Sequence, residues 1–249
     1  MSLTPLISII MPAYNCENTV IASIESALNQ TYENTQLIIT NDCSTDRTLD
    51  ILENKSASDV RIKVITNDKN SGVATSRNNA IDVAGGEFLA FLDSDDLWEP
   101  TKLEKQLKLM SETNCDICYA SYDYFDSDGK QVYDTYTVPE TISYDGLLKE
   151  NVIGLSTSVL RMSTLGDQRF STQMFHEDFA LWLMLLRSGA NACGITEVLS
   201  HNRIGGRSEN KWRSMGNRWK IYRKAEKLSI PKSFWYLSNY ALAGLKKYR

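Results

Sequence analysis

Short apolar runs rich in β-branched residues alternate with amphipathic stretches through the first 112 residues of the chain. The apolar runs are typical of buried strands, and the stretches between them place apolar residues at helical spacing. The predicted strands are 7–11, 36–40, 61–66 and 88–92, and the predicted helices are 17–30, 45–54, 73–83 and 100–112. Because repeated strand–helix units pack with right-handed crossovers, we expect an α/β fold with a mostly parallel sheet flanked by helices.

Polar and acidic residues follow three of these predicted strands. The segments are Pro12-Ala13-Tyr14-Asn15, Asn41-Asp42-Cys43-Ser44-Thr45-Asp46 and Asp93-Ser94-Asp95-Asp96. In such sheets, ligands bind beyond the carboxyl ends of the strands. We therefore expect an aromatic side chain, an isolated acid and an acid cluster to meet at one rim of the sheet.

The cluster Asp93-Ser94-Asp95-Asp96 holds three carboxylates within four residues. Such charges repel one another unless a cation neutralises them. Mg²⁺ typically takes one or two carboxylates together with substrate phosphates. Acids are also typical of a helix N-terminus, where they interact favourably with the helix dipole. The position directly after an apolar strand favours the first interpretation, a site for Mn²⁺ or Mg²⁺.

The rest of the chain is less regular, with a predicted strand at 116–122 and a predicted helix at 179–186. Residues 211–249 then hold 11 Lys or Arg, eight aromatics and one acid, Glu226, in a chain of net charge −4. A basic tail on an acidic body favours an anionic partner. Lys and Arg beside Trp and Tyr suit a membrane surface, whereas an alternative has these aromatics packed on the body as ordinary core.

The chain has five cysteines, and their spacing is not that of a disulfide framework. They are Cys16, Cys43, Cys115, Cys118 and Cys193. This usage predicts reduced thiols in a cytosolic protein, with Cys115 and Cys118 as buried structural thiols. No apolar run approaches the roughly 20 residues that span a bilayer. We therefore expect a cytoplasmic protein that does not bind nucleic acid, with the tail a candidate for peripheral attachment to the inner face of the plasma membrane.

Taken together, these motifs resemble glycosyltransferase family 2, whose fold is GT-A, a Rossmann-like architecture. The matching blocks are 8–15, 41–46, 72–78, 91–96 and 177–182, in the family's order. The tail is similar to bacterial enzymes that build capsule, O-antigen or teichuronic-acid polymers. The resemblance implies inverting transfer of a hexosyl or N-acetylhexosaminyl group. The donor would be a nucleotide-diphosphate sugar, with UDP favoured, and the acceptor a hydroxyl of a growing surface polysaccharide or a lipid-linked saccharide.

The resemblance also implies a role for individual residues. Tyr14 would stack on a pyrimidine, and Asp42 would accept a hydrogen bond from the imide N–H of uracil. Asp95 would bind the metal ion, with Asp93 beside the ribose. The full set of residues implied for the nucleotide and donor is Pro12, Tyr14, Asn15, Asp42, Arg77 and Asp93. The alternative for Arg77 is an ordinary surface arginine.

The chemistry of sugar transfer gives the acids distinct tasks. A metal ion stabilises the nucleoside diphosphate that leaves, while a carboxylate takes the proton from the attacking hydroxyl. By resemblance that base is Asp178, with Glu177 beside it and Trp182 as a candidate acceptor platform. The alternative is that Glu177 and Asp178 are only the first-turn acids of a helix.

One segment departs from the family's pattern. Many relatives follow the base with Tyr-Arg-x-His-x-x-Ser, whose histidine can join the metal site, but the corresponding stretch here is 202–208. Gly205 stands at the position of that histidine and has no side chain to bind a metal ion. Arg203, Arg207 or Lys211 would then supply charge to the diphosphate instead.

Two other functions are compatible with a nucleotide-binding sheet. A sugar-nucleotide nucleotidyltransferase usually has a Gly-rich loop with Arg or Lys after its first strand, which residues 12–16 lack. A non-catalytic carbohydrate- or nucleotide-binding module would need neither Asp95 nor Asp178. We therefore predict a GT-A domain at 1–210, with a nucleotide-binding half at about 1–112 and an acceptor half at about 113–210, and a helical basic extension at 211–249.

Overall fold

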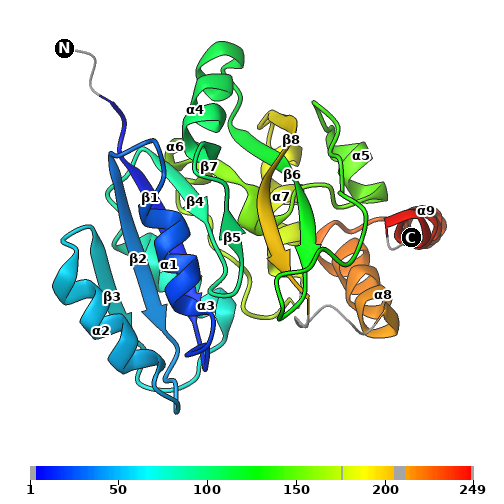
Figure 1. Ribbon diagram of the computed structural model, residues 1–249. Helices are drawn as coiled ribbons and strands as arrows, with labels where there is room; N and C mark the ends of the chain where they lie inside the picture. Colours follow the sequence, from blue (N-terminus) through cyan, green and yellow to red (C-terminus); the bar gives the residue numbers. More distant parts are fainter. Residues whose placement is uncertain (1–3, 175, 205–210, 248–249) are drawn as a thin grey trace.

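The computed structural model describes residues 4–174, 176–204 and 211–247 (Figure 1). These residues form one eight-stranded sheet of order β3-β2-β1-β4-β7-β6-β8-β5. The strands are β1 (Ile7–Ala13), β2 (Thr35–Asn41), β3 (Ile62–Thr66), β4 (Phe88–Phe91), β5 (Leu97–Trp98), β6 (Ile117–Phe125), β7 (Val159–Arg161) and β8 (Ala192–Arg203). The helices are α1 (Val20–Leu28), α2 (Thr48–Ser58), α3 (Val73–Asp82), α4 (Lys102–Thr113), α5 (Tyr144–Lys149), α6 (Met162–Leu165), α7 (Glu177–Arg187), α8 (Lys211–Lys220) and α9 (Ile230–Lys247).

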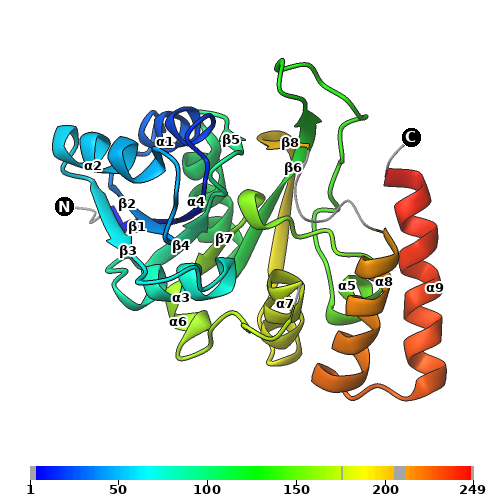
Figure 2. The same cartoon turned by 90° about the horizontal axis from the view of Figure 1, so that it is seen from below.

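The first four strands form the parallel half of the sheet, with β1 between β2 and β4 and with β3 at the edge. Successive side chains of a strand point to opposite faces. Ile9 accordingly packs in a core with residues of α1, α2 and α4, whereas Ile10 packs with residues of α3 and α7. Figure 2 shows the two sets of helices on opposite faces of the sheet. The predicted α/β architecture is confirmed.

The second half of the sheet mixes strand directions. β7 lies antiparallel between β4 and β6, β6 and β8 are parallel, and the short β5 is antiparallel to β8. The sequence analysis missed β5, β7 and β8. β5 and β7 are two and three residues long, and β8 ends in the polar run Ser200-His201-Asn202-Arg203 without an apolar period.

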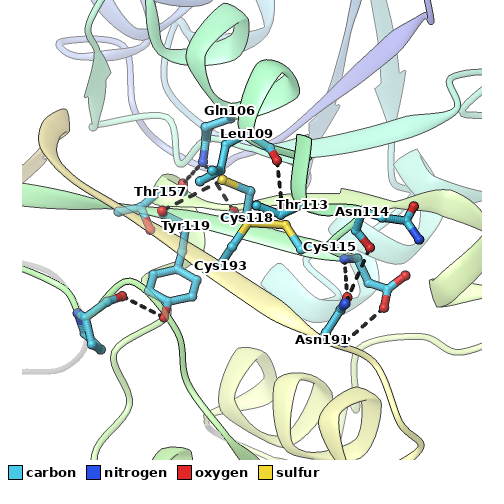
Figure 3. Close-up of a disulfide and its surroundings, with 12 residues drawn as sticks. Gln106, Leu109, Thr113, Asn114, Cys115, Cys118, Tyr119, Thr157, Asn191 and Cys193 are labelled. Atoms are coloured by element: carbon cyan, nitrogen blue, oxygen red, sulfur yellow. Dashed lines mark hydrogen bonds between the residues drawn. A yellow bond between two sulfur atoms is a disulfide. The ribbon is translucent and has the colours of Figure 1, made fainter. Parts of the chain in front are cut away.

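A disulfide joins Cys115 to Cys193 across 78 residues (Figure 3). The prediction that all five cysteines are reduced is therefore wrong for this pair, whereas Cys16, Cys43 and Cys118 are free thiols and Cys118 is buried, as expected. The spacing of cysteines could not reveal this pair. Cys193 comes close to Cys115 only because β8 pairs with β6, in register Cys118↔Cys193.

The tail is helical, and it packs on the side of the molecule away from β3 (Figure 1). α8 continues into a π-helical segment at Ile221–Ala225, and α9 returns antiparallel beside it. Tyr222 is fully buried and donates a hydrogen bond to the carbonyl of Leu148 at 2.6 Å. The expectation that tail aromatics pack as core is thus confirmed for Tyr222, whereas Phe234 and Trp235 are exposed. Among the described residues, none of the helices has the length and apolar character needed to span a membrane.

Candidate active site

The loops that follow β1 and β2 are tied together at the carboxyl edge of the sheet. The backbone N–H of Asn15 donates to Ser44 Oγ at 3.1 Å, and that of Thr45 donates to Asn15 Oδ1 at 2.8 Å. Asn15 and Cys43 adopt left-handed φ values of 47° and 59°, which turn the chain sharply at both strand ends. Tyr14 is left 47% exposed on this rim. Its side chain is therefore accessible from solvent, and Asn15 serves to join the two loops.

Asp42 is buried at the end of β2 and its carboxylate accepts three hydrogen bonds. The donors are Asn67 Nδ2 at 2.7 Å and the backbone N–H groups of Ser71 and Gly72, each at 2.8 Å. Gly72 has a φ of 85°, a conformation that side chains disfavour, and it begins α3. A carboxylate can accept about four hydrogen bonds. Asp42 thus fixes the start of α3 and retains little capacity for a further donor such as uracil.

The three acids after β4 have different surroundings. Asp93 accepts from Arg77 Nη2 at 2.6 Å. Asp96 is buried. Its carboxylate accepts one hydrogen bond from Ser156 Oγ at 2.5 Å and another from the backbone N–H of Arg203 at 2.9 Å. Burial, followed by the charges of Asp95 and Asp93, raises the pKa of Asp96 well above its ordinary value. Asp96 therefore holds the acid turn against β8 and faces no ligand.

Asp95 differs from the other two acids of this turn. No described side chain donates a hydrogen bond to its carboxylate. Burial, together with the charge of Asp93, raises its pKa to about 6. The backbone N–H of Asp95 and the charge of Arg203 offset this rise only in part, and a bound cation would lower the pKa further. Within 4–174, 176–204 and 211–247, no group of three or more His, Cys, Asp or Glu side chains is arranged to hold a metal ion. The arrangement fits an ion held by Asp95 and completed by substrate phosphates.

Arg77 lies fully buried between the acid turn and α7. Its Nη2 is 2.6 Å from Asp93 Oδ1, and its Nη1 is 2.6 Å from Glu177 Oε1. The guanidinium also lies 5.6 Å from the centre of the Phe170 ring. Burial opposes the charged form, but Asp93 and Glu177 outweigh it and raise the pKa of Arg77. Arg77 therefore acts as a link within the protein, and its buried guanidinium offers little contact to a nucleotide.

Glu177 and Asp178 both lie in the first turn of α7. Glu177 is buried in its ion pair with Arg77. Asp178 is half-buried, and no hydrogen bond or ion pair from the described part of the chain engages its carboxylate. Of the two, Asp178 is the carboxylate available to take a proton, and Glu177 holds the turn that presents it.

Two predicted site residues lie away from solvent. Trp182 is fully buried in the core, with its ring 6.1 Å from that of Phe91. It has no surface for a saccharide, so the expectation of an acceptor platform is wrong, and Trp182 supports the site only by packing. Pro12 is buried within β1, beyond the last β1–β4 pair at Ile10↔Phe91. It shapes the strand end without reaching the rim.

The structure adds Ser156 to the site. Its Oγ donates to Asp96 and accepts from the backbone N–H of Asp93 at 3.2 Å, while its carbonyl accepts from Trp98 Nε1 at 2.6 Å. The sequence offers only the weak signal of three consecutive hydroxyl residues, 156–158, before a strand. Ser156 joins the acid turn to the short helical turn Leu155–Thr157.

Arg203 is found beside the acid turn, as the departure from the family's pattern suggests. Its Nε lies 3.4 Å from the carbonyl oxygen of Asp95, and its guanidinium lies 4.6 Å from the centre of the Phe125 ring. The positive charge of Arg203 therefore lies next to Asp95, the candidate metal ligand. Arg207 and the side chain of Lys211 lie outside the described residues.

Sequence comparisons identify relatives of this chain. The family model described as Glycosyl transferase family 2 matches residues 8–182. A Bacillus subtilis (strain 168) protein, TuaG, described as a candidate teichuronic acid biosynthesis glycosyltransferase, is 37% identical over 98% of this chain and 97% of its own length. Escherichia coli WfgD is 38% identical over 98% of this chain and 95% of its own length. It is described as UDP-Glc:alpha-D-GlcNAc-diphosphoundecaprenol beta-1,3-glucosyltransferase.

Solved structures share the fold. TarS from S. aureus, in a crystal structure with UDP, matches with a TM-score of 0.69 at 20% identity, over 94% of this chain and 70% of that chain. The mannosyltransferase PcManGT from Pyrobaculum calidifontis, in complex with GDP-Man and Mn²⁺, matches with a TM-score of 0.72 at 16% identity, over 96% and 69%. At these identities the likeness concerns the fold, and it confirms the expected GT-A architecture.

Proposed function

Because the chain belongs to glycosyltransferase family 2, we propose that this glycosyltransferase transfers a sugar from a UDP-sugar with inversion and with the help of a divalent cation. One observation carries the proposal. Arg77 binds both Asp93, two residues before Asp95, and Glu177, the residue before Asp178. The guanidinium of Arg77 thus joins the two segments that carry Asp95 and Asp178, the carboxylates that the proposal assigns to the metal ion and to the proton.

The rim after β1 and β2 supports a uridine nucleotide. Tyr14 offers an exposed ring for stacking on a pyrimidine, whereas the carboxylate of Asp42 at the neighbouring strand end is already engaged by Asn67, Ser71 and Gly72. Solved structures of TarS contain UDP and UDP-GlcNAc, and WfgD is described with UDP-Glc as donor. PcManGT, with GDP-Man, shows that the shared fold also accommodates a purine nucleotide. The choice of UDP therefore rests on Tyr14 and on the closer sequence relatives.

A bound cation on Asp95 would stabilise the negative charge that develops on the departing diphosphate. Arg203, beside Asp95, adds positive charge on the same side. Asp178 accepts the proton of the acceptor hydroxyl as that oxygen bonds to the anomeric carbon. The bond from this carbon to the diphosphate oxygen breaks on the opposite face. One displacement therefore inverts the anomeric configuration and requires no enzyme nucleophile.

The acceptor class follows from the relatives. WfgD is described with a diphosphoundecaprenol-linked GlcNAc, and TuaG with teichuronic acid biosynthesis. Both match this chain over nearly its whole length, including the tail. The acceptor that we propose is a hydroxyl of a lipid-diphosphate-linked saccharide or of a growing surface polysaccharide.

The test is a product analysis with UDP-glucose and UDP-GlcNAc as donors and a synthetic GlcNAc-diphosphate-lipid as acceptor. Reactions contain Mn²⁺, Mg²⁺ or a chelator. The proposal expects UDP release that requires both metal and acceptor, with a β-linkage by NMR from these α-linked donors. In a parallel reaction with UTP and glucose 1-phosphate, pyrophosphate release would indicate a nucleotidyltransferase instead. Donor binding without release of either product would indicate a binding module, and a retained α-linkage would overturn the single displacement.

A further inference from the structure

Exposed apolar side chains gather on one helix of the tail. Ten large apolar side chains of the described residues are exposed, and four of them lie on α9. These four are Ile230, Phe234, Trp235 and Leu242, exposed by 54%, 58%, 62% and 62%. Isolated exposed apolar residues are ordinary on any protein, but a group on one helix marks an interaction surface. We call these four residues the α9 apolar face.

The orientation of α9 is fixed by contacts on its other side. Arg218 of α8 lies between the rings of Phe179 and Tyr240, 3.8 Å and 4.0 Å from their centres. Tyr236 packs near Tyr222, with 6.0 Å between ring centres. α9 is therefore docked on the body by one side. The spacing of Trp235 and Leu242 places them on the side turned away, whereas Phe234 lies at the boundary with α8, its ring centre 4.8 Å from that of Trp219. Figure 2 shows α9 as the outermost helix at this end of the molecule.

Lysines gather at one end of this face, where the carboxylate of Asp145 on α5 accepts a hydrogen bond from Tyr236 and interacts with Lys232. The exposed charged residues of 214–242 are all lysines, namely Lys220, Lys224, Lys227 and Lys232. The acid of this segment, Glu226, is buried and paired with Arg187 at 2.7 Å. Lys224 and Lys227 lie in the connection between α8 and α9, next to Ile230 at the start of α9. Ile230, Phe234 and Trp235 therefore lie at the same end of the helical pair as these lysines, whereas Leu242 lies about three turns beyond Ile230 along α9.

We propose that the α9 apolar face docks on an anionic lipid surface. Phe234 and Trp235 enter the boundary between headgroups and acyl chains, and Lys227 and Lys232 meet lipid phosphates. Charge favours this occupant over a second copy of the chain, because a two-fold contact through this face would bring lysines against the same lysines. This docking would bring the chain to the surface that carries a lipid-linked acceptor, and in that respect it rests on and extends the proposed function.

Co-sedimentation of the full chain tests the docking, with vesicles of phosphatidylcholine alone or mixed with phosphatidylglycerol, at low and at high salt. We expect binding only to the anionic vesicles, weakened by salt. Each Lys→Gln change at Lys227 or Lys232 should weaken it about fivefold, since a lysine near such a surface contributes about that factor. Phe234→Ser with Trp235→Ser should abolish it. Val60→Ser, at a fully exposed apolar residue between α2 and β3, should bind as the unmodified chain does.

Equal binding by the Phe234→Ser/Trp235→Ser and Val60→Ser variants would overturn the proposal, and so would negligible binding of the unmodified chain to every vesicle. Light scattering measures the oligomeric state of the same variants. A dimer that dissociates on Phe234→Ser with Trp235→Ser would overturn the lipid docking and make the face a contact between copies. UDP release with a short soluble acceptor, measured on the same variants, should stay unchanged. Failure of the docking is thereby distinguished from failure of the proposed transfer activity.

Discussion

The guanidinium of Arg77 and the carboxylate of Glu177 lie 2.6 Å apart, although 100 residues separate them in the chain. Both side chains are buried, and Arg77 makes a second contact of 2.6 Å with Asp93. The side chain of Arg77 therefore joins α3, the turn after β4 and the first turn of α7. We expect the relative position of Asp95 and Asp178 to depend on this link.

Replacing Arg77 should damage both stability and transfer. Arg77→Met leaves Glu177 buried without its cation, and breaking a buried pair on one side costs about 3–5 kcal/mol. Lys105→Met, which breaks the exposed pair with Glu197, should cost less than about 1 kcal/mol. Urea unfolding of both variants measures the difference. Equal stability of the two would contradict the link.

A double variant separates structure from activity. Arg77→Met with Glu177→Gln removes the stranded buried charge and should recover part of the lost stability. Transfer should stay low, because nothing then fixes Asp178 relative to Asp95. UDP release and urea unfolding, measured on the same samples, check this. Recovery of transfer together with stability would mean that Arg77 serves folding alone.

Asp95→Asn should abolish metal-dependent binding of the donor and leave the fold intact. Because burial and Asp93 raise the pKa of Asp95 to about 6, its charge opposes folding at neutral pH in the absence of metal. The melting temperature of metal-free Asp95→Asn should therefore equal or exceed that of the unmodified chain. Calorimetry with UDP and Mn²⁺ measures the binding. A folded variant that still binds donor in a metal-dependent way would remove Asp95 from the metal site.

His201 should make stability depend on pH. Its Nδ1 lies 2.6 Å from Asp123 and its Nε2 lies 2.8 Å from Glu99. Burial lowers the pKa of His201, but the hydrogen bonds and charges of Glu99 and Asp123 outweigh burial and raise it above 6.5. The stabilisation is thus complete below 6.5 and is lost as the pH rises through the folded-state pKa.

His201→Asn removes that contribution. The melting-temperature difference between the unmodified chain and the variant should be largest in mild acid and should shrink as the pH becomes alkaline. Thermal unfolding over this pH range measures it. A difference that does not change with pH would show that His201 contributes by packing alone.

The elements of residues 1–112 could be predicted from the sequence because their strands are short apolar runs separated by helices, and β1 and β4 are buried on both faces. The predicted strand 7–11 and helix 73–83 match Ile7–Ala13 and Val73–Asp82 closely. β8 was missed because no local sequence pattern marks it as a strand. Its polar residues are held extended by pairing with β6. The rule that ligands bind beyond strand ends directed attention to Tyr14, Asp42 and the acid turn, and the structure places them just after β1, β2 and β4.

The directions of the side chains in the site were harder to predict from the sequence than the strands and helices. Trp182 lies one helical turn beyond Asp178, and the sequence does not say which side of α7 faces the core. Arg77 resembles a surface residue until Glu177 and Asp93 are placed around it. Ser156 became part of the site only through contacts with residues about 60 positions earlier. These assignments depend on contacts between distant segments, which a single sequence does not display.

Asp178→Asn, compared with Asp50→Asn, tests the account most directly. Both are first-turn acids, of α7 and of α2, so the pair separates a catalytic acid from an ordinary helix N-terminal acid. The dissociation constant for UDP with Mn²⁺ and the rate of transfer are measured on both variants. The account predicts that Asp178→Asn binds UDP as the unmodified chain does and loses transfer by at least about 10²-fold, while Asp50→Asn changes neither. Transfer by Asp178→Asn at the rate of Asp50→Asn would contradict the account.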